Sequence, residues 1–384
     1  MNWLDIIVIA VLSVYTLFIV VPIFVLLFDG RDEKLYLYIY RFTPKEKISI
    51  IVPFRNEAGV ILNCLKGIIE QEFPKELVEI ILVDDNSEDD TKQLAESFLK
   101  EKQVTYKLIN LKEKNLTGKK TAIEQAVLVA SGSIIITRDA DTYTKSNHWL
   151  MSIAYHFRNR TSDLLLAPVI LSGSSFIQAF QQFENIAMTC AGYAFTKIKL
   201  PFVCSGANLA YRKDSFLKTN PYKENKHIAS GDDMFLLQSF MKAQFSISAS
   251  KNSDMIVYTN AVPNLLGIKS FINQRLRWAS KVKSLKIKTA WGVASLLVAT
   301  NLLLLIYVIV GLFSSANSKF CLFALLYKCV IDFLLLFLAA VMYKQKLNFA
   351  FYIPAFIANL FYVPFITIAS IIVKPSWKGR KISG

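Results

Sequence analysis

Long apolar runs lie near both ends of the chain and enclose a long region of mixed polarity. The first run, residues 6–28, is long enough to span a bilayer. It has no basic residues before it and is too long for a cleaved signal peptide, so residues 1–28 are predicted to be a retained transmembrane anchor. Three further runs, 290–313, 320–343 and 349–373, predict C-terminal membrane helices within residues 290–373.

Two features distinguish these C-terminal runs from plain apolar spans. The last run contains Pro354, Asn359 and Pro364, which disfavour a regular helix, so we expect a broken, re-entrant or strongly tilted segment there. In the middle run, Lys328 and Asp332 lie four residues apart. On a helix they face the same side, which predicts a structural ion pair.

The region between the membrane segments alternates between strand-like and helix-like patterns. Short runs rich in β-branched residues predict strands, and longer runs with apolar residues at helical spacing predict helices between them. The predicted strands are residues 48–53, 78–83, 104–111 and 133–137, and the predicted helices are 58–71, 91–100 and 119–130. This order is typical of an α/β, Rossmann-like, doubly wound parallel sheet, which we assign to a domain of residues 29–262.

Two later stretches of this domain carry their own patterns. Residues 176–194 have apolar side chains at three- and four-residue steps, which predicts an amphipathic helix, either packed on the sheet or lying near lipid, with core packing favoured. Residues 203–212 contain Gly206 and Asn208, which suggest a strand where the backbone approaches a ligand closely.

The net charge of +15 could indicate a nucleic-acid partner, but the basic residues gather beside the membrane segments. Residues 263–289 and the tail, 374–384, are basic, and the first of these segments reads as an interfacial amphipathic helix. This distribution follows the positive-inside rule and favours contact with anionic lipid over a nucleic-acid groove. The five cysteines have no metal-binding spacing, so we expect free thiols.

Polar clusters follow three of the predicted strands at their carboxyl ends. They are residues 53–57, residues 84–87 and the pair Asp139 and Asp141. In open α/β sheets this edge binds ligands, so the clusters are expected to meet in one crevice. Two carboxylates two residues apart can bind one hard cation, although Asp residues also simply end strands and form turns.

The motifs of this region occur in a specific order. They are residues 53–57, the Asp84-Asp85-Asn-Ser run, Gly118-Lys119, Asp139-Ala-Asp141, Gly231-Asp232-Asp233 and Gln274-Arg-Leu-Arg277-Trp278. The set resembles glycosyltransferase family 2, which has the GT-A fold. The flanking apolar runs are similar to those of its membrane-bound branch, which includes ceramide glucosyltransferase-like and processive members.

The resemblance implies a role for each motif in transfer from a nucleotide-diphosphate sugar. Asp84 and Asp85 would bind the base or ribose, and Glu57 and Lys119 would be further nucleotide contacts. Lys119 is also one of two adjacent lysines at a helix start, which gives it a purely local alternative.

The remaining motifs would serve the metal, the acceptor and the diphosphate. Asp141 would bind Mg²⁺ or Mn²⁺, and Asp139 would bind the sugar nucleotide or share the metal, because hard oxygen ligands suit these ions. Asp233 would be the general base, or else part of a pair of acids capping a helix. The resemblance also implies that Gln274 and Arg277 would hold the diphosphate. Trp278 would stack on a sugar or an acceptor head group.

Other polar residues receive local interpretations. Arg275 fits an interfacial helix better than the active site, and Asp89, Asp90 and Thr91 are expected only to cap a helix. Two histidines, His148 and His156, lie on an apolar stretch and are expected to be structural.

These observations predict an inverting, metal-dependent glycosyltransferase that transfers from a UDP-sugar to a lipid acceptor at the cytoplasmic leaflet. We expect a multi-pass protein of the cell inner or plasma membrane with its catalytic domain in the cytoplasm, where nucleotide sugars are found. The alternative is a processive polysaccharide synthase. A transporter or inactive scaffold is disfavoured, because few charges lie in the membrane segments and the full set of acids is present.

Overall fold

A computed structural model describes residues 3–29, 42–113, 116–226, 228, 230–261, 267–282, 284–313, 315–373, 376–377 and 380–381. The boundary expected near residue 263 and most of the tail, 374–384, therefore lie outside the described residues. Within the tail, strands β11 (Ser376–Trp377) and β12 (Arg380–Lys381) pair antiparallel.

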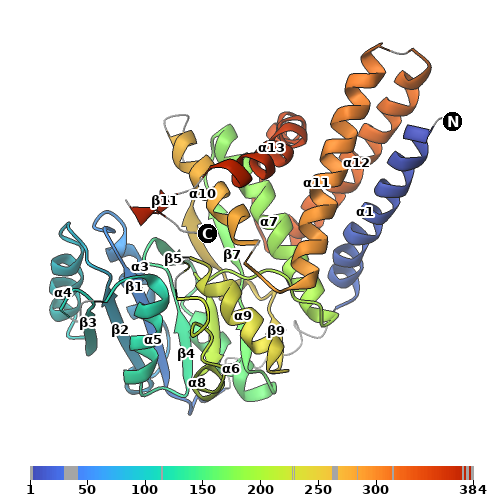
Figure 1. Cartoon of the computed structure of the whole chain (residues 1–384). Coiled ribbons are helices and arrows are strands. Elements are labelled where there is room, and N and C mark those ends of the chain that lie inside the picture. The colour runs from blue at the N-terminus through green and yellow to red at the C-terminus, as the bar shows by residue number, and fades with distance from the viewer. Residues whose placement is uncertain are drawn as a thin grey trace.

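Four helices among the described residues are long and apolar enough to cross a membrane. Three of them, α1 (Trp3–Phe28), α11 (Lys288–Phe313) and α12 (Ser315–Met342), contact one another and project from the α/β domain as a bundle (Figure 1). The predicted ion pair is confirmed in this bundle, with Lys328 Nζ 2.5 Å from Asp332 Oδ2. The hydroxyl of Tyr15 donates to the other oxygen of Asp332 at 2.6 Å, so α1 shares the pair.

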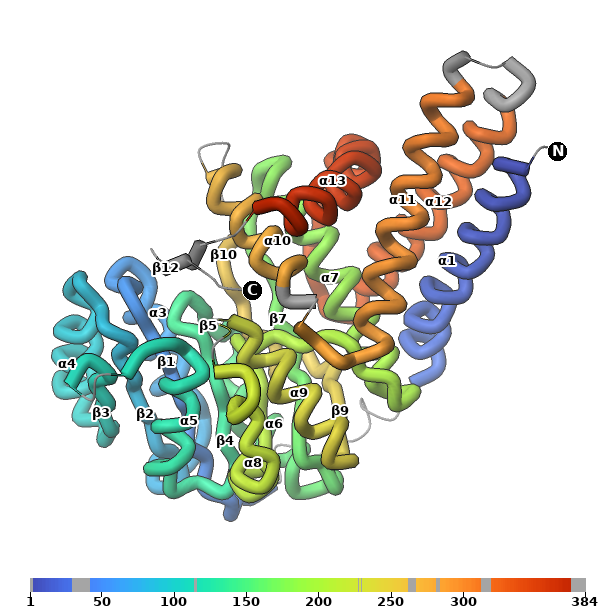
Figure 2. The backbone as a smooth tube through the Cα atoms, in the orientation of Figure 1, coloured from blue at the N-terminus to red at the C-terminus, as the bar shows by residue number. Residues whose placement is uncertain are grey.

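The fourth helix, α13 (Tyr352–Ile372), follows a short 3₁₀ turn, Phe349–Phe351. It lies across the bundle rather than along it and contacts α10 (Ile268–Val282) (Figures 1 and 2). The expectation of a tilted segment agrees with this orientation, whereas the expectation of a broken one is wrong. Pro354 falls in the first turn, where its missing N–H breaks no helical hydrogen bond, and Pro364 lies within the continuous helix.

The central sheet contains seven strands in the order β3-β2-β1-β4-β8-β6-β9. Its strands are β1 (Ile48–Phe54), β2 (Val78–Asp84), β3 (Tyr106–Asn110), β4 (Ile134–Thr137), β6 (Leu164–Leu166), β8 (Leu209–Arg212) and β9 (Ile247–Ala249). The four predicted strands form its parallel half. A wholly parallel sheet is wrong, because β8 runs antiparallel to both β4 and β6. Only the end of predicted strand 203–212 is extended, since Asn208 N–H donates to Ser205 in a turn before β8.

Helices cover both faces of this sheet, and the alternation of side chains along β1 shows how. Ile48, Ile50 and Val52 belong to one core with helices α3 (Ile61–Ile69), α4 (Thr91–Glu101) and α6 (Trp149–Asn159). Ile51 faces the other core, which contains α5 (Lys119–Val129) and α9 (Asp232–Lys242). That second core continues without interruption into the membrane helices, so the two parts of the protein share one apolar interior.

Helix α7 (Phe176–Lys197) connects the α/β domain to the membrane helices. It begins with a capping box in which Ser175 and Gln178 bind each other's backbone N–H groups. The helix packs against β7 (Val169–Ser172) and against α1, α12 and α13, so it is a core helix, as predicted. Strand β7 pairs with β10 (Val257–Asn260), which also pairs with β5 (Thr142–Thr144) in a second, smaller sheet. Helix α8 (Lys213–Thr219) follows β8.

The end of α1 is tied to the α/β domain by Asp29. Its carboxylate accepts from the Tyr193 hydroxyl at 2.5 Å and forms an ion pair with Lys197 at 2.8 Å. The Lys251 ammonium donates to the Asp29 carbonyl at 2.7 Å. The first membrane helix is therefore held in a defined position relative to the catalytic sheet.

Candidate active site

Loops that follow β1, β2 and β4 meet the start of α9 around a cavity of about 810 Å³. Every motif contributes side chains to the sheet end of this cavity, although Asp84 is not among them. The motif residues that line it include Glu57, Asp85, Lys119, Asp139, Asp141, Asp232, Asp233, Gln274, Arg277 and Trp278. The predicted convergence at the carboxyl edge of the sheet is thus present in the fold. A cavity of this size is within the range of small-molecule sites.

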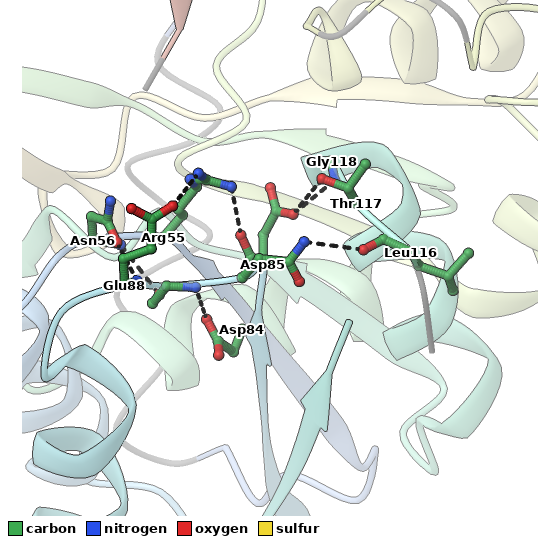
Figure 3. Close-up of polar contacts among 10 residues, drawn as sticks. Arg55, Asn56, Asp84, Asp85, Glu88, Leu116, Thr117 and Gly118 are labelled. Atoms are coloured by element: carbon green, nitrogen blue, oxygen red, sulfur yellow. Dashed lines mark hydrogen bonds and ion pairs between the residues drawn. The ribbon is translucent and has the colours of Figure 1, made fainter. Parts of the chain in front are cut away.

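The two adjacent acids after β2 have different surroundings (Figure 3). Asp84 accepts a hydrogen bond from the Ser87 N–H at 2.8 Å, which stabilises the turn and keeps this carboxylate out of the cavity lining. Asp85 accepts from the Gly118 N–H at 2.9 Å and from the Thr117 hydroxyl at 3.1 Å. Burial raises the pKa of the Asp85 carboxyl, while those two hydrogen bonds act to lower it. Of the two, Asp85 is the one placed to meet a ligand.

Arg55 and Glu57 hold the loop after β1 next to these acids. The Arg55 guanidinium donates to the Asp85 carbonyl at 3.3 Å and forms an ion pair with Glu88 at 3.2 Å (Figure 3). Glu57 lines the cavity, and its backbone N–H donates to the Thr91 hydroxyl at 2.7 Å. This bond explains how the start of α4 supports the first motif.

The expectation that residues 89–91 only cap a helix is wrong in part. Asp90 is the N-cap residue of α4, yet its side chain makes no capping hydrogen bond. Asp89 instead accepts from the Thr91 N–H at 3.1 Å and, across the loop, from the Ala58 N–H at 3.2 Å. Asp89 therefore joins the loops after β1 and β2.

Lys119 stands at the centre of the acidic cluster. Its ammonium lies 2.6 Å from Asp139 Oδ1 and 3.1 Å from Asp232 Oδ2, so it bridges the loop after β4 and the start of α9. Burial alone would lower its pKa, but the carboxylates of Asp139 and Asp232 together raise it above its usual range. The local interpretation of Lys119 is wrong, whereas it suits the neighbouring Lys120, which turns away to bind Asn225.

Gly206 allows this close approach, as its sequence position suggests. A Cβ at this position would lie 2.8 Å from Asp232 Oδ2 and 3.2 Å from Lys119 Nζ. The N–H of Gly206 donates to Asp233 Oδ2 at 3.3 Å. Any larger side chain here would push the two charged groups apart.

Asp233 is the second residue of α9 and lines the cavity, but its side chain makes no capping hydrogen bond. Its Oδ1 accepts from the N–H of Met234 at 2.8 Å, while Oδ2 faces Gly206. The preceding Asp232 is the site residue that sequence reasoning did not assign. Its signal was the adjacent pair of acids, but spacing cannot tell which acid of a pair meets a lysine from a different motif.

The Asp139–Asp141 loop is held from beneath by buried groups. Arg138 is fully buried, lies 4.9 Å from the Trp149 ring and donates to the Thr142 hydroxyl at 3.1 Å. That hydroxyl in turn donates to the Asp139 carbonyl at 2.6 Å. Asp139 and Asp141 both line the cavity, and Asp141 is exposed.

These two carboxylates fit part of a divalent metal site. Among the described residues, no group of three or more His, Cys, Asp or Glu side chains is placed to hold a metal ion. Two hard oxygen donors on one cavity wall instead suit an ion whose other ligands come from a bound diphosphate or water.

Helix α10 places its motif over the same cavity. Gln274, Arg277 and Trp278 line it, and Trp278 is 44% exposed. Burial lowers the pKa of the Arg277 guanidinium, while the carboxylates of Asp232 and Asp139 act to raise it. The positive side chain of Arg277 therefore faces the acidic cluster from the membrane side.

Comparison with known proteins agrees with this geometry. Residues 49–219 match the family model described as glycosyl transferase family 2. Residues 49–219 form a glycosyltransferase family 2 domain. The match contains the motifs up to Asp141, whereas the second acid pair and α10 lie beyond it.

Two curated relatives of this chain have names that state what they synthesise or modify. A poly(ribitol-phosphate) β-glucosyltransferase of Bacillus spizizenii is 28% identical over 54% of this chain and 31% of its own length. A β-monoglucosyldiacylglycerol synthase of Nostoc sp. is 31% identical over 32% of this chain and 26% of its own length. The chain spans less than two thirds of the length of the curated relatives that it matches.

The glycosyltransferase fold also extends over the membrane helices. The mannosyltransferase PcManGT of Pyrobaculum calidifontis, solved with GDP-Man and Mn²⁺, matches with a TM-score of 0.57 and 16% identity. The match covers 96% of this chain and 99% of that one. At this identity the likeness establishes the fold, including the GT-A catalytic domain.

Arg275 of the glycosyltransferase corrects an expectation from the sequence. It is not an interfacial anchor, since its side chain is 3% exposed and its guanidinium lies 2.6 Å from Glu184 Oε2 of α7. It also lies 4.3 Å from the Trp278 ring. A basic residue on an amphipathic helix matches a lipid surface as well as a buried acid, so its partner is visible only in the fold.

The two histidines are structural, as expected. His156 is buried and its Nε2 lies 2.7 Å from the Ser248 hydroxyl, and burial lowers the pKa of its ring to about 3. His148 is the N-cap residue of α6 and faces Glu72 on the surface.

The same cavity of the glycosyltransferase continues into the membrane helices, which the sequence did not predict. There it is lined by side chains of α1, α7, α11, α12 and α13. We call this part the membrane chamber, and its walls are mainly apolar: Phe18, Ile19, Phe180, Phe183, Ala191, Leu297, Val298, Leu335, Leu336, Ala355, Phe356, Val363 and Ile366. Hydrophobic runs identify membrane helices, but they do not reveal a space between them.

Proposed function

We propose that this enzyme transfers sugar from a nucleotide-diphosphate sugar to a lipid acceptor, with inversion at the anomeric carbon. The observation that carries the proposal is the single cavity that joins the charged cluster of the GT-A domain to the apolar membrane chamber. A soluble acceptor would have no use for that chamber, whereas a lipid could keep its chain there while its head group reaches Asp233. The glycolipid synthase of Nostoc sp. is a relative with this kind of acceptor.

The sheet end of the cavity supports the donor part of this proposal. Asp85 and Glu57 would contact the base and ribose, and UDP is the expected nucleotide. Gln274 and Arg277 would hold the diphosphate, because a guanidinium can donate two hydrogen bonds to phosphate oxygens. Lys119 keeps Asp139 and Asp232 in position by its two ion pairs and adds positive charge beside the leaving group.

Direct displacement needs one base on the acceptor side, and Asp233 is our assignment. Its Oδ2 accepts a hydrogen bond from the Gly206 N–H at 3.3 Å, and the carboxylate lines the cavity. It would accept the acceptor proton as the new glycosidic bond forms.

A divalent ion, Mg²⁺ or Mn²⁺, would be held by Asp141, with Asp139 as a second contact. When bound, it would neutralise charge on the departing diphosphate. The residues fit such an ion through hard oxygen donors on one wall of the cavity.

The membrane arrangement that we propose places the catalytic domain in the cytoplasm. The tail lies on the same side, since its basic residues oppose translocation. Cysteines introduced by Lys45→Cys and Ser315→Cys would then be labelled from opposite sides of the membrane, and a reporter fused after Gly384 would report the side of Lys45. A reporter on the side of Ser315 would mean that α13 crosses the membrane.

A processive polysaccharide synthase is the second candidate. It is favoured by the Gln-x-x-Arg-Trp motif of α10 and by the polar side chains that line the membrane chamber, among them Tyr15, Gln181, Asn185, Asn301, Asp332 and Asn359. The mainly apolar walls weigh against a path for a hydrated glycan.

The experiment offers the purified full-length protein a panel of nucleotide sugars together with a membrane lipid extract. Mass spectrometry then reads the products. We expect a new lipid that is heavier by one or a few sugars with one donor of the panel. Transfer to no lipid with any donor would sink the proposal.

A further inference from the structure

The charges that line the cavity bear on the chemistry of the acceptor. Four cationic side chains line its described walls, and each faces a carboxylate. Arg55 pairs with Glu88, Arg275 pairs with Glu184, and Lys119 lies between Asp139 and Asp232. The fourth, Arg277, faces Asp232, Asp139, Asp233 and Asp141.

Acidic groups outnumber these cations on the same walls. The carboxyl groups that line the cavity are Glu57, Asp85, Asp139, Asp141, Glu184, Asp232, Asp233 and Asp332. A nucleotide-diphosphate sugar brings further negative charge, and Arg277 and Lys119 are the cations nearest to where it would bind. An acceptor ending in a phosphate monoester would add an anion beside Asp233 with no further cation from the described lining to pair with it. Burying such a charge without a partner is strongly unfavourable.

An uncharged hydroxyl does not meet this penalty, and it needs the base that the site provides. We propose that the acceptor is a lipid whose nucleophile is a neutral hydroxyl group, and that its chain occupies the membrane chamber. This inference rests on the proposed function. The hydroxyl oxygen bonds to the anomeric carbon, the bond from that carbon to the diphosphate breaks, and the diphosphate leaves with the electron pair. The hydroxyl proton passes to Asp233, so the step balances without another reactant.

The membrane chamber suits the hydrocarbon part of such a lipid. Phe183 and Ala191 of α7, Leu336 of α12, and Ala355 and Phe356 of α13 are buried and line it. Apolar chains that leave water or lipid for these walls gain contact area without burying a polar group. The two alanines mark places where a larger side chain would narrow the space.

Two lipid pairs with matched chains test the nucleophile. The full-length protein in detergent, with the active donor, is given diacylglycerol or phosphatidic acid, and polyprenol or polyprenyl phosphate. We expect the hydroxyl member of at least one pair to be glycosylated about 10²-fold faster than its phosphate partner, because the partner buries an unpaired charge. Preference for the phosphate member in either pair would overturn the inference.

Products from the whole membrane extract give an independent reading of the same linkage. A glycoside on a hydroxyl oxygen survives mild acid, whereas a sugar on a phosphate oxygen is released. We expect acid-stable glycolipid, and acid-labile product would overturn the inference while leaving lipid glycosylation intact. Absence of any lipid product is the separate failure of the proposed function.

Two phenylalanine substitutions on α13 test the chamber. Ala355→Phe fills part of it and is expected to slow transfer to a long-chain alcohol about 10-fold, because the ring takes up space that the lipid chain would otherwise occupy. Ile353→Phe on the exposed side of the same helix is the matched control. Equal rates for the two variants would contradict the assignment of the chamber.

Retained binding of UDP by Ala355→Phe, measured by calorimetry, shows that the variant is folded. If binding is lost, Ala191→Leu on α7 fills the chamber from the other side with a smaller change. The same 10-fold loss is then expected, and an unchanged rate would again count against the chamber.

Discussion

Asp233 is the carboxylate whose surroundings best fit proton abstraction from an acceptor. Lys119 bridges Asp139 and Asp232, while Asp233 accepts hydrogen bonds from the Met234 N–H of its own helix and from the Gly206 N–H. We expect Asp233→Asn to reduce transfer by roughly 10²-fold or more and to leave nucleotide binding nearly unchanged, since the amide cannot accept the proton. Asp214→Asn, at the exposed start of α8, is the control. Near-normal turnover by the Asp233 variant would refute the assignment.

Asp141 is expected to act through the diphosphate rather than through the acceptor. Asp141→Ala should weaken binding of the nucleoside diphosphate in Mg²⁺ or Mn²⁺ by about 10-fold or more, because one oxygen ligand is lost. Titration calorimetry with and without the ion measures this difference. Binding that is equally strong in excess chelator would remove the metal from the account.

His156 makes the stability of the catalytic domain depend on pH. Burial holds its pKa at about 3, whereas an unfolded chain has a histidine pKa near 6.5. The contribution of neutral His156 to stability is therefore fully present above about pH 6.5. It is lost as the pH falls towards 3, because the unfolded state gains the proton first. At pH 5 the loss is about 2 kcal/mol.

Thermal unfolding of the detergent-solubilised protein between pH 7 and pH 5 measures this effect. His156→Gln should flatten the dependence more than His148→Gln, since His156 is buried and His148 is partly exposed. A slope unchanged by His156→Gln would show that other groups cause it.

Among single residues, the sequence predicted which side chains line the cavity better than it predicted their contacts. The positions of Asp85, Asp139, Asp141 and Asp233 follow from strand ends and motif order, and all four line the cavity. The ion pair of Lys119 with Asp232 joins two motifs more than a hundred residues apart, and local spacing holds no record of such a contact.

At the scale of elements, α10 connects the donor site to the membrane helices. Arg275 binds Glu184 of α7 and stacks between Phe271 and Trp278, and the Tyr362 hydroxyl of α13 donates to Glu184 at 3.3 Å. One half-buried carboxylate thus joins three helices around the cavity. This pair is expected to position Arg277 and Trp278, which lie on the next turn of α10.

Arg275→Ala should weaken binding of the nucleoside diphosphate and lower stability by about 1 to 2 kcal/mol, because the half-buried Glu184 loses the guanidinium that donates to it. The exchange Arg275→Glu with Glu184→Arg should recover part of both losses. Lys269→Ala at the exposed start of α10 is the matched control. If the exchanged pair binds no better than Arg275→Ala, the contact does not position the motif.

Long or strongly patterned elements were predictable, and short ones were not. The four parallel strands and the helices between them follow from apolar runs and their polar ends. Strands β6, β8 and β9 contain only three or four residues, so their local signal is weak and tertiary pairing determines them. The direction of β8 depends on the path of the chain between β4 and β8, and the local pattern of apolar and polar residues does not predict that path.

At the scale of the whole molecule, the catalytic domain and the membrane helices share one apolar interior. The sequence located both parts, and residues 176–194 were expected to pack on the sheet. It could not show that α7 also forms a wall of the membrane chamber, because an apolar helix face fits a sheet, a lipid or another helix equally well. The chamber is the feature that separates a lipid glycosyltransferase from a polymer synthase here.

The size of the product distinguishes transfer to a lipid from synthesis of a polymer. The full-length protein is incubated for a long time with excess nucleotide sugar and membrane lipid, and the products are separated by mass. A chamber with mainly apolar walls predicts a lipid carrying one or a few sugars, whose amount grows with time while its length does not. A lipid-free glycan of high molecular weight would contradict the account and favour a processive synthase.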